Sequence, residues 1–252
     1  MNNSEYPTDA ALIDRAIANA TSVRGTTAPN PWVGAVVLTE DGEVFDGATR
    51  PAGGPHAERI ALEAAGQAVR GATLATTLEP CCHSGRTDPC VDHIIEAGVV
   101  RVVVGLTDPD PRVAGGGIRA LRNAGIEVVE GVRKRAATAQ LEPYLHHRRT
   151  GRPWVVLKMA LTLDGRTAAP DSSSQWITSE EARRDGRSLR ARCDAVLVGA
   201  GTVRSDDPSL TVRDVSGIDP QRIVLGRAPA GAAVHPCWEM QGKLEALLEQ
   251  MG

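Results

Sequence analysis

The chain has 252 residues, of which 42% are hydrophobic and 23% are charged, and its formal net charge is −3. This length is sufficient for a substantial core and typical of two domains, whereas a negative net charge does not favour a polyanionic partner such as DNA or tRNA. The first six residues carry no basic or apolar leader, and no eighteen apolar residues follow one another, so we expect a cytoplasmic protein with a small-molecule substrate and no membrane partner.

Helical and strand patterns alternate along the first 147 residues. Apolar residues at helical spacing predict a helix over 9–23, which Thr8 or Asp9 can cap and Gly25 can end. Two strands are predicted at 32–38 and 43–48, with a hairpin turn between them. Further strands are predicted at 72–78, 99–106 and 126–129. Between them, one helix is predicted to begin near residue 56, a second to run from 90 to 98, and a third to span 117–124. This order predicts a mixed sheet covered by helices.

The five cysteines favour a metal site over disulfides. Their number is odd, and three of them cluster between Cys81 and Cys90. A chain of this length also needs no covalent staples. Cys193 and Cys237 are interpreted as ordinary thiols.

Four side chains of this first region form the inventory of a catalytic zinc site. His56 offers an imidazole, Cys81 and Cys90 offer thiolates, and Glu58 adds a carboxylate. Zinc prefers tetrahedral nitrogen and sulfur ligands, and a catalytic site leaves the fourth position to water beside a general base. H-x-E followed by P-C-x-x-C marks zinc deaminases, but here the second cysteine follows nine residues after the first. His56 and Cys90 are expected in the first turns of helices, where positive potential favours a thiolate.

Two other classes of protein share part of this inventory. A noncatalytic zinc module needs a fourth ligand, which Cys82 or His83 can supply, but it leaves Glu58 without a role. A nucleic-acid-editing zinc deaminase needs a basic surface, which the net charge does not favour.

The residues around the proposed ligands resemble the deaminase domain of the bifunctional riboflavin-biosynthesis RibD proteins. The motifs are PNP at 29–31, PHAE at 55–58, LEPCCHSGRTDPC at 78–90 and DPDP at 108–111. The resemblance implies a cytidine-deaminase-like three-layer α/β/α domain, with zinc on His56, Cys81 and Cys90, a catalytic Glu58, and Cys82 as a bystander. The implied substrate is 2,5-diamino-6-ribosylamino-4(3H)-pyrimidinone 5′-phosphate.

Three further residues are candidates for contacts with that substrate. Arg86 lies on a glycine-containing loop and can pair with a phosphate through two parallel hydrogen bonds, although a solvated loop arginine is the alternative. Asn30 lies between two prolines and is either a hydrogen-bond partner of the ring or ribose or a turn residue. The resemblance places Asp108 near the substrate too, whereas Asp110 stands where many relatives have asparagine.

A domain boundary is predicted where residues 151–153 break the chain after a helix that ends near His147. The expected domains are therefore residues 1–147 and 148–252. In the second, residues 154–159 are predicted to form a buried strand, 195–198 a strand that leads into a Gly-x-Gly turn, and 243–251 an amphipathic helix.

Motifs at 157–166, 174–178 and 206–213 resemble the RibD reductase domain. The resemblance implies a partial dihydrofolate-reductase-like α/β domain that uses NADPH to reduce the ribosyl group to ribityl. Matching positions assign the NADPH contacts to Ala160, Trp176, Thr202 and Asp206, and the substrate contacts to Ser174, Arg190, Leu210 and Arg213. Trp176 can also be read as a core residue, and residues 206–208 as a turn.

Two departures from the reductase pattern limit this expectation. Gly226 and Arg227 stand where the family usually has Asp-Ser, and the chain stops before the strands and the glycine-rich loop that complete the domain in the resembling proteins. We therefore expect this chain alone to deaminate but not to reduce. We also expect a second domain that is marginally stable or needs a partner chain, and we leave a homo-oligomer open.

Overall fold

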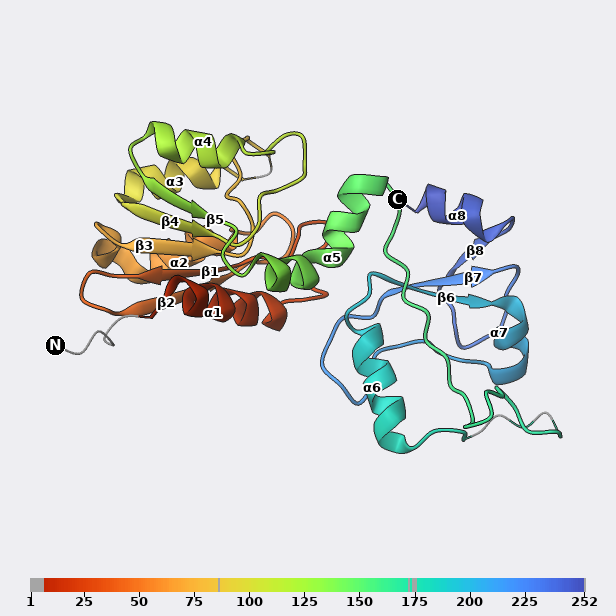
Figure 1. Cartoon of the computed structure of the whole chain (residues 1–252). Coiled ribbons are helices and arrows are strands. Elements are labelled where there is room, and N and C mark those ends of the chain that lie inside the picture. Colours follow the sequence, from red (N-terminus) through yellow and green to blue (C-terminus); the bar gives the residue numbers. More distant parts are fainter. Residues whose placement is uncertain (1–6, 86, 172, 174–175, 252) are drawn as a thin grey trace. The chain divides into compact units, whose positions relative to one another are not determined.

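The computed structural model describes residues 7–85, 87–171, 173 and 176–251. The chain forms two compact units (Figure 1), unit 1 over Met1–Gly151 and unit 2 over Arg152–Gly252. Each unit has its own sheet, and each is described by itself below.

The sheet of unit 1 has five strands in the order β2-β1-β3-β4-β5. They are β1 (Gly34–Leu38), β2 (Val44–Ala48), β3 (Thr73–Thr76), β4 (Arg101–Val104) and β5 (Glu127–Glu130). β1 pairs antiparallel with β2 and β3, whereas β3, β4 and β5 are parallel. The prediction of a mixed sheet is therefore confirmed; β1 to β4 are shorter than expected, and β5 has the expected length but begins one residue later.

Helices cover both faces of this sheet and make three layers (Figure 1). α1 (Asp9–Ser22) lies on one face, and α2 (Ala57–Ala65), α3 (Cys90–Ala97) and α4 (Gly116–Asn123) lie on the other. A short 3₁₀-helix, η1 (Gly66–Val69), follows α2, and α5 (Lys134–Thr150) packs its buried Leu141 and Leu145 into the core that α2, α3 and α4 cover. The expected α/β/α architecture is thus present.

The alternation of side chains along β1 explains why both faces are covered. Val36 packs with Ala75 of β3 and Val103 of β4 against α1, while Ala35 and Val37 enter the core beneath α2, α3 and α4. Successive residues of a strand point to opposite faces, so an apolar strand of this kind requires a layer on each side.

Local signals set the ends of several helices as expected. The Thr8 side chain accepts a hydrogen bond from the Ala11 N–H at 3.3 Å and caps α1. Gly98 ends α3 with φ of 78°, a conformation that glycine adopts without strain.

Gly34 permits α1 to approach β1, because a Cβ there would lie 1.8 Å from the Ala16 carbonyl oxygen.

α5 ends later than the sequence analysis predicted. It continues past His147 to Thr150, and Gly151 then takes the left-handed conformation and donates its N–H to the His147 carbonyl at 2.8 Å. Gly151, the first residue of the predicted break, provides the stop signal.

Unit 2 contains a smaller sheet of three parallel strands, β6 (Ala195–Gly199), β7 (Gln221–Leu225) and β8 (Trp238–Met240). α7 (Ala200–Asp206) begins directly after β6, and its Val203 packs with Val224 in the local core. The other helices are α6 (Glu180–Arg190), whose side chains are all at least partly exposed, and the short α8 (Leu244–Gln250).

The prediction of a buried strand over residues 154–159 was wrong. The segment belongs to no strand of the sheet, and its apolar side chains are exposed, with Leu157 at 81% of its full accessibility. An apolar run becomes a buried strand only where a neighbouring strand takes its backbone hydrogen bonds and another layer covers its side chains. Within the described residues, unit 2 provides neither for this segment.

Among the described residues, every helix is too short or too polar to cross a membrane.

Candidate metal centre and active site

Three elements of unit 1 bring the proposed metal ligands together. His56 is the N-cap residue of α2, Cys90 is the first residue of α3, and Cys81 follows the carboxyl end of β3 in the middle of the sheet. The Val91 N–H donates to the Cys81 carbonyl at 3.2 Å, which joins the start of α3 to the segment after β3. The ligands therefore lie at helix starts and a strand end, as the sequence analysis expected.

The distances between the ligand atoms fit a tetrahedral zinc ion. His56 Nδ1 lies 3.6 Å from Cys81 Sγ and 3.3 Å from Cys90 Sγ, and all three ligand atoms lie within 4.8 Å of one another. With ordinary zinc–sulfur and zinc–nitrogen bond lengths, the N···S edge of a tetrahedron measures about 3.6 Å. The backbone N–H of Cys90, which is not itself a ligand atom, donates to Cys81 Sγ at 3.3 Å and so stabilises the Cys81 thiolate.

Hydrogen bonds among His56, Cys81 and Cys90 shift the pKa values of the two thiols in opposite directions. The pKa of Cys81 is lowered well below that of a free thiol, mainly by the hydrogen bond from the Cys90 thiol and also by His56 and the Cys90 N–H. The pKa of Cys90 is raised in turn, by the thiolate of Cys81 and by burial. The hydrogen bond with Cys81 raises the pKa of His56.

Glu58 lies beside this group as the second residue of α2. Its side chain is only 4% exposed, and burial raises its pKa to about 7, with Cys81 acting in the same direction and His56 against it. A carboxyl group that titrates near neutral pH can both take up and return a proton. The site thus holds a candidate acid–base group next to a candidate metal position.

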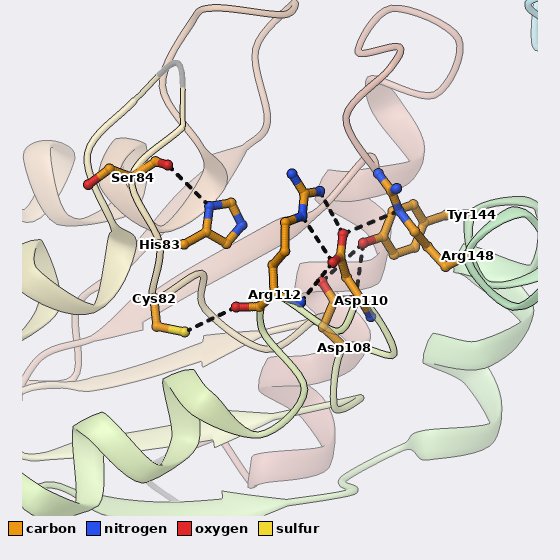
Figure 2. A network of polar contacts seen from close by, with 8 residues as sticks. All are labelled: Cys82, His83, Ser84, Asp108, Asp110, Arg112, Tyr144 and Arg148. Atoms are coloured by element: carbon orange, nitrogen blue, oxygen red, sulfur yellow. Dashed lines mark hydrogen bonds and ion pairs between the residues drawn. The ribbon is translucent and has the colours of Figure 1, made fainter.

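Cys82 and His83 point to other partners. The Cys82 thiol faces the Arg112 carbonyl at 3.8 Å, and His83 Nδ1 lies 3.5 Å from the Ser84 carbonyl (Figure 2). In the described part of the chain, the compact group of potential ligands contains His56, Cys81 and Cys90 and no fourth residue. This arrangement argues against the closed tetrahedron of a noncatalytic zinc module.

The three candidates for substrate contacts have different surroundings. Asn30 closes a turn, because its N–H donates to the Thr27 carbonyl at 2.9 Å and its carbonyl accepts from the Thr27 hydroxyl at 3.0 Å. Arg86 lies outside the described residues. Asp108 is buried in the loop between β4 and α4, and Tyr144 of α5 donates its hydroxyl to both carboxylate oxygens.

Asp110 has two arginine partners in this chain (Figure 2). Arg112 holds it through two side-chain hydrogen bonds of 2.7 and 3.1 Å, and Arg148 of α5 approaches it to 3.5 Å. The Arg112 guanidinium keeps the pKa of Asp110 far below that of an ordinary carboxyl group. Its carboxylate is therefore occupied by cations of the same chain.

Glu79 and Tyr144 belong to the site network although no role was predicted for either from the sequence. The Glu79 carboxylate is buried and accepts hydrogen bonds from the N–H groups of Asp108, Gly115 and Ile118 at 3.0 to 3.1 Å. Its place beside Pro80-Cys81 was a usable signal, since a charged residue after a buried strand needs partners. Tyr144 lies on an ordinary amphipathic helix 36 residues from Asp108, and nothing in the sequence links the two.

In unit 2, the structure brings together several of the proposed substrate residues. Arg190 at the end of α6 donates to the Thr211 carbonyl at 2.7 Å, next to the buried Leu210. Burial lowers the pKa of the Arg190 guanidinium, and the positive charges of Arg213 and Arg187 lower it further. Converging like charges of this kind favour an anionic ligand. Ser174 lies outside the described residues.

The proposed NADPH residues of unit 2 are less enclosed. Trp176 is 69% exposed and its ring is covered on one face by Arg183, whose Cζ lies 4.3 Å from the ring centroid, so Trp176 is not a core residue. Thr202 and Asp206 are exposed and lie one turn apart on α7, hence on the same face of that helix. Ala160 is half-buried in the extended segment that precedes them.

Two family models match the chain. Residues 7–106 match the cytidine and deoxycytidylate deaminase zinc-binding region, and residues 153–234 match the RibD C-terminal domain. The first model covers the His56, Cys81 and Cys90 group, and the second covers most of unit 2.

Individual relatives agree with these models. The chain is 45% identical to RibD of Synechocystis sp. over 220 residues, which cover 87% of this chain and 60% of that protein. It is 48% identical to RibD of Mycobacterium tuberculosis over 233 residues, or 90% of this chain and 68% of that protein. The chain therefore spans only about two thirds or less of the length of these relatives.

A solved structure shows the same fold. The diaminohydroxyphosphoribosylaminopyrimidine deaminase/5-amino-6-(5-phosphoribosylamino)uracil reductase of Thermotoga maritima matches with a TM-score of 0.86 and 37% sequence identity, over 96% of this chain and 77% of that protein. The sequence identities, the two family models and this structural match together show that the chain belongs to the RibD family.

Proposed function

We propose that unit 1 catalyses the zinc-dependent hydrolytic deamination of 2,5-diamino-6-ribosylamino-4(3H)-pyrimidinone 5′-phosphate in riboflavin biosynthesis. The observation that carries the proposal is the group of His56, Cys81 and Cys90, whose ligand atoms lie within 4.8 Å of one another beside the buried Glu58. The names of the RibD relatives support the reaction and the pathway.

The three ligands can hold zinc in a site of catalytic type. One imidazole and two thiolates satisfy three tetrahedral positions, and their mutual distances fit zinc bond lengths. A zinc ion held there would act as a Lewis acid and make water a good nucleophile at neutral pH. The protein contributes the arrangement of the ligands and the N–H of Cys90 that supports Cys81.

Glu58 performs the proton transfers in this proposal. Its carboxylate takes a proton from the attacking water, whose oxygen forms a bond to the amine-bearing carbon of the pyrimidine ring. Glu58 then returns the proton to the amino nitrogen, and the carbon–nitrogen bond breaks with release of ammonia. A pKa of about 7 suits a group that accepts and donates a proton in one cycle.

Asp108, Asn30 and Arg86 are proposed to bind the substrate. The Asp108 carboxylate accepts hydrogen bonds from substrate donors, Asn30 contacts the ring or ribose, and the Arg86 guanidinium pairs with the phosphate. The fixed orientation of Asp108, with Tyr144 on both of its oxygens, supports its part of this assignment.

Unit 2 is proposed to be the reductase, which reduces the ribosyl group of the deaminated intermediate to ribityl. NADPH would supply the hydride, and Ala160, Trp176, Thr202 and Asp206 are the proposed contacts to it. Arg190, Leu210, Arg213 and Ser174 are the proposed substrate contacts, and the convergence of Arg190 and Arg213 supports an anionic group there. The match of residues 153–234 to the RibD C-terminal domain supports the assignment as a whole.

We also propose that the protein works in the cytoplasm on a small molecule. All five cysteines are free thiols, as expected in a reducing compartment.

The test is ammonia release by the purified chain loaded with zinc, with the diaminopyrimidinone ribosyl phosphate as substrate. We expect turnover that a zinc chelator removes and added zinc restores. A zinc-loaded protein that releases no ammonia from this substrate would refute the proposed deaminase.

A further inference from the structure

Asp108 lies on a loop whose backbone is fixed at both ends by one buried carboxylate. Glu79 accepts hydrogen bonds from the N–H of Asp108 at 3.1 Å and from those of Gly115 and Ile118 at 3.0 and 3.1 Å. Glu79 itself stands two residues before the proposed ligand Cys81. A buried carboxylate is stable only with several such donors, and these three hydrogen bonds join the loop to the segment that carries Cys81.

The side chain of Asp108 is oriented from a different element. Tyr144 of α5 places its hydroxyl 3.0 Å from Oδ1 and 3.1 Å from Oδ2 of Asp108 (Figure 2). The Asp110 N–H donates to Oδ1 at 2.9 Å. A carboxylate has about four acceptor positions, so these donors leave Oδ2 with acceptor capacity for one more partner.

Two arginines that lie near Asp108 in the described part of the chain, Arg112 and Arg148, form no ion pair with it. Arg112 and Arg148 form their ion pairs with Asp110 instead. Asp108 therefore keeps neutral partners, a phenol and a backbone amide, which orient a carboxylate without cancelling its charge.

We propose that Tyr144 is a positioning residue for the deaminase reaction, which holds the Asp108 carboxylate in the orientation that accepts a hydrogen bond from an O–H or N–H group of the substrate. This inference rests on the proposed deaminase function and on Asp108 as a substrate contact.

The electrostatics of the loop make the inference measurable. Burial raises the pKa of Asp108, while the Asp110 N–H and the Tyr144 hydroxyl lower it. Among the described residues, the titratable groups that face Asp108 are Tyr144 from α5, Glu79 from the segment after β3, and Asp110 and Arg112 from its own loop, and Arg148 stacks on the Tyr144 ring. Removal of the hydroxyl therefore raises the pKa of Asp108, and the acid limb of substrate binding moves to higher pH.

The experiment compares Tyr144→Phe with wild-type protein and with Thr138→Val. Phenylalanine keeps the ring and removes only the hydroxyl, while Thr138→Val removes a hydroxyl from the same helix; no hydrogen bond of the described residues links Thr138 to Asp108. We expect Tyr144→Phe to keep its zinc, to raise KM about tenfold because a hydrogen bond to a charged group is lost, and to change kcat little. Titration of the Asp108 carboxyl by carbon-13 NMR should show a higher pKa in Tyr144→Phe and an unchanged pKa in Thr138→Val.

A double-mutant cycle separates positioning from folding. In an Asp108→Asn background, Tyr144→Phe should raise KM no further, because its effect passes through that carboxylate. An unchanged KM in Tyr144→Phe, an unchanged Asp108 pKa, or equal effects with and without Asp108 would each overturn the inference. A wild-type protein without ammonia release would instead refute the proposed function and this inference with it.

Discussion

In unit 1, the ligand atoms of His56, Cys81 and Cys90 lie within 4.8 Å of one another, and Cys90 belongs to the same core as the fully buried Leu74. In unit 2, the apolar segment 154–163 lies exposed, and the proposed cofactor residue Trp176 is 69% exposed. The deaminase-type site is assembled by the segment that follows the central strand β3 and by the starts of α2 and α3, whereas the reductase-type residues are spread over an uncovered segment, two helices and a loop. The site of unit 1 is built from short segments that pack against its sheet, so the folded sheet holds the ligands in place. The proposed site of unit 2 is built from separate loops and helices, so its geometry depends on every segment that supports them.

The largest expected effect tests whether His56, Cys81 and Cys90 are the three protein ligands of the zinc site in unit 1. Cys81→Ser and Cys90→Ser should each lose zinc and all ammonia release above background, because a hydroxyl is a poor zinc ligand. Cys82→Ser, whose parent thiol faces the Arg112 carbonyl, should keep one zinc per chain. Metal analysis after gel filtration decides the matter: loss of zinc from Cys82→Ser together with retention by Cys90→Ser would show a different ligand set.

The next effect concerns catalysis without loss of metal. Glu58→Gln should bind zinc normally and slow ammonia release by about 10² to 10⁴, the usual contribution of a general acid and base. Glu63→Gln on the exposed face of the same helix, where Glu63 pairs with Arg59, is the matched control and should leave the rate unchanged. A Glu58→Gln variant that turns over at the wild-type rate would remove this residue from the mechanism.

A third prediction compares the unfolding temperatures of the two units. Unit 2 exposes apolar side chains that a stable fold would cover, so we expect calorimetry to record its unfolding at a lower temperature than that of unit 1. Removal of zinc should lower only the upper transition, by about 5 °C or more, since a ligand stabilises the unit that binds it. A single transition that zinc leaves unmoved would contradict the comparison.

The smallest effect concerns an ion pair on the surface of unit 1. Arg101 holds Asp9 through hydrogen bonds of 2.7 and 2.8 Å, and these lower the pKa of that carboxyl group. A lowered folded-state pKa adds stability above the ordinary carboxyl pKa, and this stability is lost as the pH falls through the lowered value. Asp9→Asn should therefore reduce the free energy of unfolding by about 1 kcal/mol or less at pH 7 and by less than that at pH 2.

Denaturant unfolding at the two pH values measures this difference. Glu142→Gln on the exposed side of α5 serves as the control and should behave like wild type at both. A deficit in Asp9→Asn that is as large at pH 2 as at pH 7 would show that the ion pair is not its cause.

Much of unit 1 could be predicted from the sequence because its signals are local. Apolar periodicity, the Thr8 cap and the Gly98 stop predict helices that the structure contains, and the spacing of His56, Cys81 and Cys90 points to ligands that the fold brings together. Whether an apolar segment becomes a buried strand, by contrast, depends on the segments that pack against it. Residues 154–159 have the composition of a buried strand, yet without a neighbouring strand among the described residues they remain exposed.

The polar network around Asp108 could not be predicted in the same way. Tyr144 joins it across 36 residues, and Asp110 is neutralised by Arg112 and Arg148 rather than left for a substrate. Such pairings depend on how α5 packs against the loop after β4, which no local pattern encodes.

The most direct test of the zinc-deaminase account is zinc K-edge X-ray absorption on the purified, zinc-loaded chain. The account predicts two sulfur neighbours at about 2.3 Å and two nitrogen or oxygen neighbours at about 2.0 to 2.1 Å, from His56, Cys81, Cys90 and one water. A shell of three sulfur atoms, or one without an exchangeable oxygen ligand, would show a closed structural site and contradict the assignment of unit 1 as a deaminase.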